Sequence, residues 1–272
     1  MKYPALEIRT TASDRLFIAI DDLSATAIDE RDDSVHVFFS TSAARDTARS
    51  ALAAHFDVSS IEVSDEDWAR RSQDGLQPVT VGRITVFPNP EFLSNPRSLI
   101  RNPSPIAMVI QPSMGFGTGH HATTRLCLAA LQTLDLTDAF VLDIGTGSGV
   151  LAIAAGRLGA ARALGIDDDI DAVRSALENL DLNPAAQRVS FEVDDLRTAT
   201  LPRADVVTAN LTGALLVRAA QTLLGAVNNG GTLVASGLLS TERDEVVGAL
   251  GAATVTWERE EDGWVGLAVK KP

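Results

Sequence analysis

The spacing of hydrophobic residues changes along the chain. Over the first 64 residues apolar and polar positions alternate, as at Val35, Val37 and Phe39, and this alternation predicts strands with one buried face. Ser13 and Ser42 are the expected caps of two helices. The pattern predicts strands at residues 5–10, 26–30, 35–40 and 60–64, and helices at residues 13–27 and 42–56. This βαββαβ order predicts a ferredoxin-like α+β domain over residues 1–64.

Beyond residue 107, short continuous apolar runs alternate with helical patterns, which is typical of a buried parallel sheet. We expect strands at residues 107–111, from 141, and at 163–167, 189–193, 204–209, 232–236, 253–258 and 264–269, with helices at 125–134, from 151, and at 170–180, 215–227 and 241–250. The segment 228–231 is an expected turn, and the last two strands form an antiparallel pair. The prediction for residues 107–272 is a Rossmann-like, doubly wound, seven-stranded mixed sheet. Residues 65–106, rich in proline, form the expected interdomain linker, with one short strand expected within it at residues 83–87.

A glycine-rich turn dominates this second domain. Val141–Val150 reads as an apolar strand, an acid, three alternating glycines and the start of a helix. Gly145 and Gly147 allow a tight turn and close backbone approach, and the helix N-terminus offers free N–H groups. A dinucleotide site prefers glycine or alanine at the position of Val150. The turn therefore favours S-adenosylmethionine over NAD, although such turns also close strand-helix joints that bind no ligand.

Acidic residues follow the predicted strands at this edge of the sheet. Asp143 and Asp167 are candidates to receive the ammonium and ribose hydroxyl groups of the cofactor. Asp195, after the next strand, is a candidate acceptor for the adenine amino group, with a solvated turn as the alternative. Asp168 and Asp169 can instead be acids that stabilise a helix N-terminus.

A second glycine-rich segment, residues 115–124, contains three glycines and several hydroxyl groups before a helix. Such a loop is suited to closing over a polar ligand, and Thr118 is a candidate cofactor contact in it. The alternative is a hinge with Thr123 or Thr124 as the helix cap. His120 and His121 are adjacent, and adjacent residues rarely bind one metal ion, so we expect no metal site.

Asn210 ends the strand at residues 204–209, where the carboxyl ends of parallel strands meet. Its amide is therefore expected beside the reactive end of the cofactor, as the candidate catalytic residue that accepts a hydrogen bond from an incoming amine. The alternative is an ordinary turn at the end of a strand.

Composition narrows the range of partners. The formal net charge of −13 disfavours a nonspecific nucleic-acid binder and suits a basic protein partner, although many proteins are acidic without having one. Cys127 is the single cysteine, so no internal disulfide is possible, and no apolar run has the length of a membrane span. We expect a cytoplasmic protein, a monomer, without a signal peptide.

Several of these motifs, in this order, resemble the ribosomal protein L11 methyltransferases, which are class I enzymes that use S-adenosylmethionine. The similar segments are residues 65–68, 115–121, 123–124, 142–154, 165–167 and 209–211. The resemblance implies that Thr124, Gly145, Asp167 and Asn210 contact the cofactor, that Asn210 also faces the substrate amine, and that the N-terminal domain recognises the substrate. The sequence departs from the family at Ala122 and at Thr212 and Gly213.

The resemblance predicts methyl transfer to lysine side-chain or N-terminal amines, most simply those of ribosomal protein L11. A related methyltransferase with another protein or small-molecule substrate is the first alternative, and a noncatalytic nucleotide-binding module is the second. No Pro-Pro-Tyr sequence follows Asn210, which disfavours methylation of planar amide or adenine amino groups.

Overall fold

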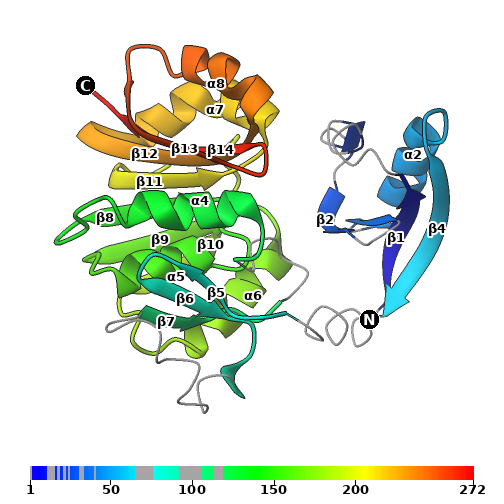
Figure 1. The fold of residues 1–272 in the computed structure, drawn as a ribbon, viewed down its shortest axis with the longest axis horizontal. Coiled ribbons are helices and arrows are strands. Elements are labelled where there is room, and N and C mark those ends of the chain that lie inside the picture. Colours follow the sequence, from blue (N-terminus) through cyan, green and yellow to red (C-terminus); the bar gives the residue numbers. More distant parts are fainter. Residues whose placement is uncertain are drawn as a thin grey trace. The chain divides into compact units, whose positions relative to one another are not determined.

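The structure is a computed structural model of the 272-residue chain. It describes residues 2–10, 16, 19–20, 23, 25–30, 34–39, 41–64, 76–91, 106–112 and 119–272. The chain divides into two compact units, one ending at Leu76 and the other beginning at Gln77 (Figure 1). Among the described residues, no helix is both long enough and apolar enough to cross a membrane.

The first unit is built on a four-stranded antiparallel sheet with the order β2-β3-β1-β4. Its elements are β1 (Lys2–Arg9), β2 (Ala25–Glu30), β3 (Val35–Phe39), α2 (Ser42–Leu52) and β4 (Asp57–Ser64). Leu16, Ala19 and Ile20 are helical and precede β2. Leu6, Ile8, Val37 and Leu52 pack together in its core. This order and connectivity confirm the predicted ferredoxin-like plan.

Helix limits in the first unit differ from the prediction, and α2 ends at Leu52, not at residue 56. Thr41, not Ser42, caps α2, because its Oγ1 accepts a hydrogen bond from the Ala44 backbone N–H at 3.1 Å. Strand β2 begins at Ala25, so the helix expected over residues 13–27 ends earlier. Ser13 lies outside the described residues.

The second unit contains a seven-stranded sheet with the order β10-β9-β8-β11-β12-β14-β13. Neighbouring strands are parallel except that β14 is antiparallel to both of its neighbours. The predicted doubly wound mixed sheet is confirmed. Its strands are β8 (Phe140–Ile144), β9 (Arg162–Asp167), β10 (Val189–Val193), β11 (Ala204–Asn210), β12 (Val227–Leu239), β13 (Thr254–Glu261) and β14 (Trp264–Lys270).

Helices cover both faces of this sheet. The helices are α4 (Ala122–Leu131), α5 (Val150–Arg157), α6 (Ile170–Asp181), α7 (Gly213–Ala226), η3 (Ser240–Glu242) and α8 (Arg243–Ala249). The adjacent β8 residues Val141 and Leu142 belong to different cores because their side chains point to opposite faces. Val141 packs in the core formed with α4 and α5, and Leu142 in the core formed with α7 and α8. Each face is therefore closed by its own apolar cluster.

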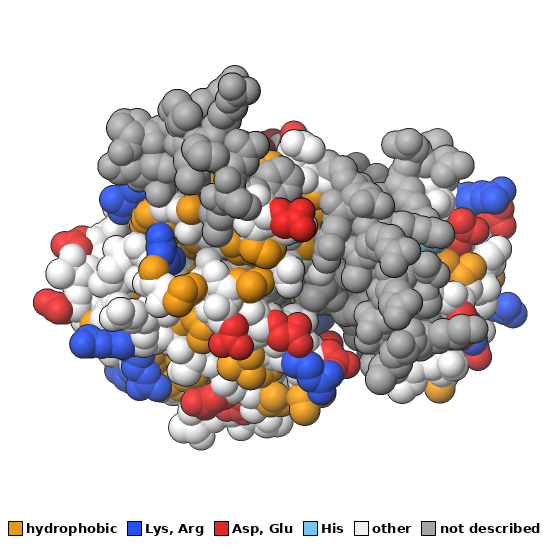
Figure 2. Space-filling model, turned by 90° about the horizontal axis from the view of Figure 1, so that it is seen from below, with side chains coloured by type: hydrophobic (Ala, Val, Ile, Leu, Met, Phe, Trp, Pro, Cys, Tyr) orange, Lys and Arg blue, Asp and Glu red, His pale blue; other side chains and the backbone are white. Residues whose placement is uncertain are grey.

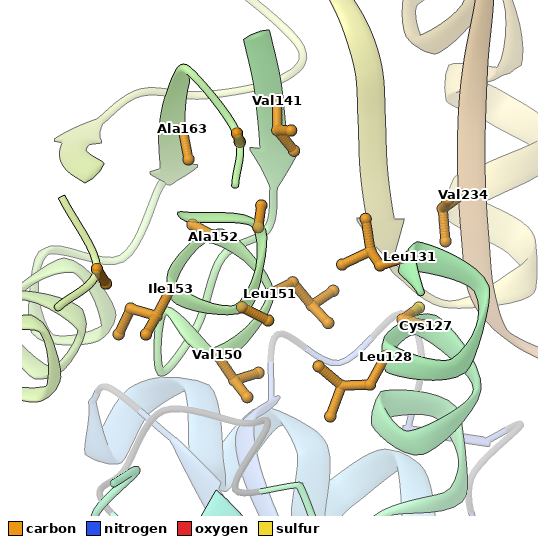
Figure 3. Close-up of a cluster of buried hydrophobic side chains, with 14 of the residues drawn as sticks. Cys127, Leu128, Leu131, Val141, Val150, Leu151, Ala152, Ile153, Ala163 and Val234 are labelled. Carbon is orange, nitrogen blue, oxygen red and sulfur yellow. The ribbon is translucent and has the colours of Figure 1, made fainter. Parts of the chain in front are cut away.

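On the sheet face that carries α4 and α5, an apolar core packs around α5, the helix that follows the glycine-rich turn. Figure 3 shows Leu151 and Ile153 of α5 within the same cluster as Cys127, Leu128 and Leu131 of α4. All five side chains are at most 3% exposed. Burying side chains of this size stabilises a fold by roughly 1.5–3 kcal/mol each relative to leaving them exposed. The start of α5 is thus fixed by apolar packing.

A small three-stranded sheet precedes α4. It consists of β5 (Val79–Val81), β6 (Ile84–Phe87) and β7 (Ile106–Val109), with β6 paired in parallel to β7. Strands β5 and β6 fall within the range 65–106 that was expected to be a linker, and they belong to the second unit. The strand at β6 was expected and β5 was not. The domain limits 1–64, 65–106 and 107–272 stay a prediction.

One further local expectation, and the alternative given for the cap of α4, were wrong. Residues 228–231, expected as a turn, are part of β12. Helix α4 begins at Ala122 with His121 as its cap, so neither Thr123 nor Thr124 caps it. A histidine ring nitrogen takes the place of the expected hydroxyl, because His121 Nδ1 accepts from the Thr123 N–H at 3.4 Å.

On the face drawn in Figure 2, acidic and hydrophobic side chains are interspersed, and basic side chains lie in several separate places.

Candidate functional site

The carboxyl ends of four neighbouring parallel strands bring most of the predicted site residues to one edge of the sheet. Asp143 is the penultimate residue of β8, Asp167 ends β9, and Asn210 ends β11. Asp195 follows β10 by two residues. In open α/β sheets this edge is where ligands bind. Thr118, also predicted as a contact, lies outside the described residues.

The turn between β8 and α5 adopts a conformation that requires glycine. Gly145, Gly147 and Gly149 have φ angles of 69°, 52° and 80°. The backbone N–H groups of Gly145 and Thr146 both donate to the Ile166 carbonyl at 2.9 Å, which ties the turn to β9. A side chain at Gly145 would meet Leu211, because its Cβ position lies 2.6 Å from Leu211 Cδ2. The turn is therefore closely packed as well as left-handed.

Asp143 lies beneath this turn and is 1% exposed. Its two carboxylate oxygens accept hydrogen bonds from Thr146 Oγ1 at 2.7 Å and Thr208 Oγ1 at 2.5 Å. Burial raises the pKa of Asp143 to about 6, although both threonine hydroxyls oppose this change. The carboxylate thus joins the turn to β11 from inside the protein.

Asp167 has a different environment at the end of β9. Its Oδ2 accepts from the Gly147 N–H at 2.9 Å and its Oδ1 from the Asp169 N–H at 3.1 Å. Partial burial raises its pKa, and the two backbone N–H groups counteract that effect. Since each carboxylate oxygen can accept two hydrogen bonds, both oxygens retain a position for a further donor. This geometry suits a pair of hydroxyl groups.

Asp195 is engaged by a basic side chain. Its Oδ1 accepts from both the backbone N–H and Nε of Arg197 at 2.8 Å, and this pairing lowers the pKa of Asp195. Arg197 also contacts Asp168, with Nη2 3.0 Å from Oδ2. Arg197 therefore connects the segments that follow β9 and β10. Asp169 caps α6, because its Oδ1 accepts a hydrogen bond from the Asp171 N–H. This acid therefore stabilises a helix N-terminus, which was the alternative given for it.

Asn210 presents a buried carbonyl oxygen at the same edge. Its Nδ2 lies 3.5 Å from Oγ1 of the fully buried Thr124. Among the described residues, Asn210 Oδ1 has no hydrogen-bond partner. A buried amide oxygen without a donor costs free energy, roughly 1–3 kcal/mol. The site therefore contains an acceptor that a bound molecule can satisfy.

The two adjacent histidines serve local structure. His120 Nε2 is 2.9 Å from the Gln77 carbonyl oxygen, and His121 Nδ1 is 2.8 Å from Thr123 Oγ1. The His121 ring also packs edge-on against Trp264, with ring centroids 5.1 Å apart. Burial is the main cause that lowers the pKa of His121 to about 4, so the ring is neutral near pH 7.

Sequence reasoning missed several residues that shape the site. Thr208 was not singled out, although it holds Asp143. Gly165 leaves space for Thr146, whose Oγ1 would clash with a Cβ at residue 165. Gly237, with φ 94°, leaves space for the Leu211 backbone next to Asn210. A glycine within an apolar strand is the signal that indicates such close approach.

The strand order, the glycine turn after the first central strand and the acid after the second define the class I S-adenosylmethionine-dependent methyltransferase fold. The family model described as ribosomal protein L11 methyltransferase matches residues 10–272. The chain belongs to the ribosomal protein L11 methyltransferase family.

Relatives in several bacteria agree with this assignment. The chain is 36% identical over 217 residues to the ribosomal protein L11 methyltransferase of Desulfitobacterium hafniense. The matched region covers 78% of this chain and 67% of that relative. It is 39% identical over 217 residues to the enzyme of Pelotomaculum thermopropionicum, and the match covers 78% of this chain and 68% of that relative. It is 45% identical over 206 residues to the enzyme of Geobacter sulfurreducens, and the match covers 73% of this chain and 64% of that relative.

The fold also matches a solved structure. The crystal structure of ribosomal protein L11 methylase from Lactobacillus delbrueckii subsp. bulgaricus superposes with a TM-score of 0.65 at 24% identity, covering 72% of this chain and all of that one. The chain is thus an S-adenosylmethionine-dependent methyltransferase in family and in fold.

Proposed function

We propose that this enzyme transfers methyl groups from S-adenosylmethionine to lysine side-chain or N-terminal amines of ribosomal protein L11. The observation that carries the proposal is the buried Asn210 Oδ1, which has no donor among the described residues and lies at the carboxyl end of β11. An amine N–H is a suitable donor for this oxygen. The family name supports L11 as the protein that supplies the amine.

The described residues fit the cofactor. The Asp167 carboxylate, held by the Gly147 and Asp169 N–H groups, has acceptor capacity for two ribose hydroxyls. Gly145 and Gly147 would lie under the amino-acid part of the cofactor, and Thr124 would contact it beside Asn210. Asp143, which is buried and bonded to two threonines, would support the turn and attract the cofactor's ammonium group through its charge. Asp195 would approach the adenine, and Thr118 stays a predicted contact.

The chemistry requires positioning more than proton transfer. When bound, S-adenosylmethionine supplies a methyl group on a positively charged sulfur, which is already a good electrophile. Asn210 Oδ1 accepts a hydrogen bond from the neutral amine and aligns its lone pair. Deprotonating a lysine with an ordinary pKa near 10.4 costs roughly 4–5 kcal/mol at pH 7, and a desolvated site reduces this cost. Thr124 keeps the Asn210 amide in its orientation through Nδ2.

We assign substrate recognition to the ferredoxin-like unit. We also propose that the reaction takes place in the cytoplasm, where ribosomal proteins are available, and that the enzyme acts as a monomer. The net charge of −13 supports a basic protein substrate. A related methyltransferase acting on another protein or on a small molecule is the alternative, motivated by the departures from the family pattern at Ala122 and after Asn210.

A substrate panel tests the proposal. The purified enzyme is incubated with methyl-labelled S-adenosylmethionine and, separately, with L11, L11 whose amines have been blocked, other ribosomal proteins and small primary amines. Label should enter unblocked L11 only. Label in another protein or in a small amine, with none in L11, would establish the alternative.

A further inference from the structure

Two buried asparagines lie four residues apart, Asn179 in α6 and Asn183 just beyond the end of this helix. Asn179 is 2% exposed and Asn183 is 5% exposed. Burying an amide costs free energy unless its donors and acceptors are satisfied, so their partners show what each side chain does. The two residues are chemically identical and close in the sequence, yet only Asn179 also contacts the glycine turn.

Asn183 binds the edge of strand β7. Its Oδ1 accepts from the Val109 N–H at 2.9 Å, and its Nδ2 donates to the Val109 carbonyl at 2.6 Å and to the Asn179 carbonyl at 2.7 Å. The side-chain amide thereby takes the place of a neighbouring strand. Asn183 anchors β7 to α6.

Asn179 connects two segments that are far apart in the sequence. Its Oδ1 accepts from the Gln111 N–H at 2.9 Å, just beyond β7. Its Nδ2 donates to the Ser148 carbonyl at 3.0 Å, between Gly147 and Gly149 of the glycine turn. A single buried side chain therefore holds both the end of β7 and the turn.

The turn has little freedom at this point. The Cβ position of Gly149 lies 3.0 Å from Ala176 Cβ, one turn before Asn179 on α6. It also lies 2.7 Å from Cζ of Phe191. With α6 this close, the hydrogen bond from Asn179 fixes the orientation of the peptide group between Ser148 and Gly149, and hence the start of α5.

We propose that Asn179 is a positioning residue for the cofactor: it holds the glycine turn in its binding conformation and links the turn to Gln111, just beyond β7. The inference rests on the proposed cofactor position at the glycine turn. Asn179 itself is buried behind the turn and contacts no reacting atom. Its loss should therefore weaken cofactor binding and leave the chemical step intact once the cofactor is bound.

Two matched variants test this assignment. Asn179→Leu and Asn183→Leu each remove one buried amide and leave backbone groups unpaired, so both should lower the melting temperature. Titration calorimetry with S-adenosylhomocysteine should show a Kd roughly tenfold higher for Asn179→Leu, because this variant loses a hydrogen bond that orders the binding site. The Kd of Asn183→Leu should change little. In the transfer assay, Asn179→Leu should raise KM for S-adenosylmethionine and retain kcat.

Equal Kd values for Asn179→Leu and the wild type would overturn the proposal, as would an equal loss in both variants, which would indicate general destabilisation. If the wild-type protein itself fails to bind S-adenosylhomocysteine, the proposed cofactor site fails instead. Hydrogen exchange on the wild type decides the matter if Asn179→Leu does not fold. S-adenosylhomocysteine should then slow exchange at the Gln111 amide, and unchanged exchange there would contradict the connection.

Discussion

At the residue scale, Asp167 and Asp143 show how two acids at neighbouring strand ends acquire different roles. Asp167 is partly exposed and held by backbone N–H groups, whereas Asp143 is enclosed by two threonine hydroxyls. We expect Asp167→Ala to weaken binding of S-adenosylhomocysteine roughly tenfold or more, because the ribose hydroxyls lose their acceptor. Titration calorimetry measures this, with the solvent-accessible Asp171→Ala as the control. Unchanged affinity would remove Asp167 from the site.

Asp143 gives a prediction for the dependence of stability on pH. Its pKa is raised from 3.8 to about 6 in the folded protein, so the folded state retains this proton more strongly than the unfolded chain. Its contribution to stability is therefore fully present below about pH 4 and is lost as the pH rises through about 6. The loss is at most roughly 3 kcal/mol.

The variant Asp143→Asn cannot ionise at this position. Its free energy of unfolding, measured by denaturant titration, should fall less than that of the wild type between pH 4 and pH 7. Parallel curves for the two proteins would show that Asp143 has an ordinary pKa.

The sequence predicted where the chemical groups lie, because strand ends and glycines are readable from local patterns. Asp143, Asp167 and Asn210 do lie at the same sheet edge. Their partners depend on contacts between distant segments, as between Thr208 and Asp143 or Asn179 and Ser148. No local pattern indicates such pairs.

At the element scale, the glycine turn is held from three sides: by β9 through the Ile166 carbonyl, by α6 through Asn179, and by Leu211 after β11. Gly145→Val should abolish cofactor binding, because the φ of 69° is unfavourable for a β-branched residue and its Cβ would clash with Leu211.

Thermal shift with and without S-adenosylhomocysteine measures this effect. Gly225→Ala in α7 is the control, since no atom lies within 4 Å of its Cβ position; it should retain the full shift and be slightly stabilised. A folded Gly145→Val protein that shows the wild-type shift would disprove the role of this glycine.

Element order was predictable because four strands of the large sheet, β8, β9, β11 and β12, contain apolar runs that are followed by helical patterns. Failures occurred where local signals were weak or misleading. Strand β5 has only three residues, none of them fully buried, and residues 228–231 contain the turn-forming pair Gly230 and Gly231, yet continue β12. His121 as a helix cap was missed because histidine is an uncommon residue there.

At the scale of the whole molecule, the predicted division of labour assigns the cofactor to the second unit and substrate recognition to the first. A truncated protein beginning at Asp65 should bind S-adenosylhomocysteine with nearly normal affinity, since every proposed contact lies between Thr118 and Asn210. Methylation of L11 should nearly cease, because binding energy from the small domain no longer holds the target amine at the methyl group.

Calorimetry and the transfer assay measure the two properties separately. A truncated protein that methylates L11 at the full rate would refute the recognition role. One that aggregates or cannot bind the cofactor would show that the first domain instead covers an apolar face of the second.

The central claim is that Asn210 orients an L11 amine for methyl transfer, and mass spectrometry of L11 tests it most directly. L11 is incubated with S-adenosylmethionine and either the wild type or Asn210→Leu, and its intact mass and its peptides are then measured. We expect the wild type to add whole methyl groups to lysine or N-terminal amines, and the variant to add them about a hundredfold more slowly. Unmodified L11 after incubation with the wild type, or equal rates for the two proteins, would contradict this account.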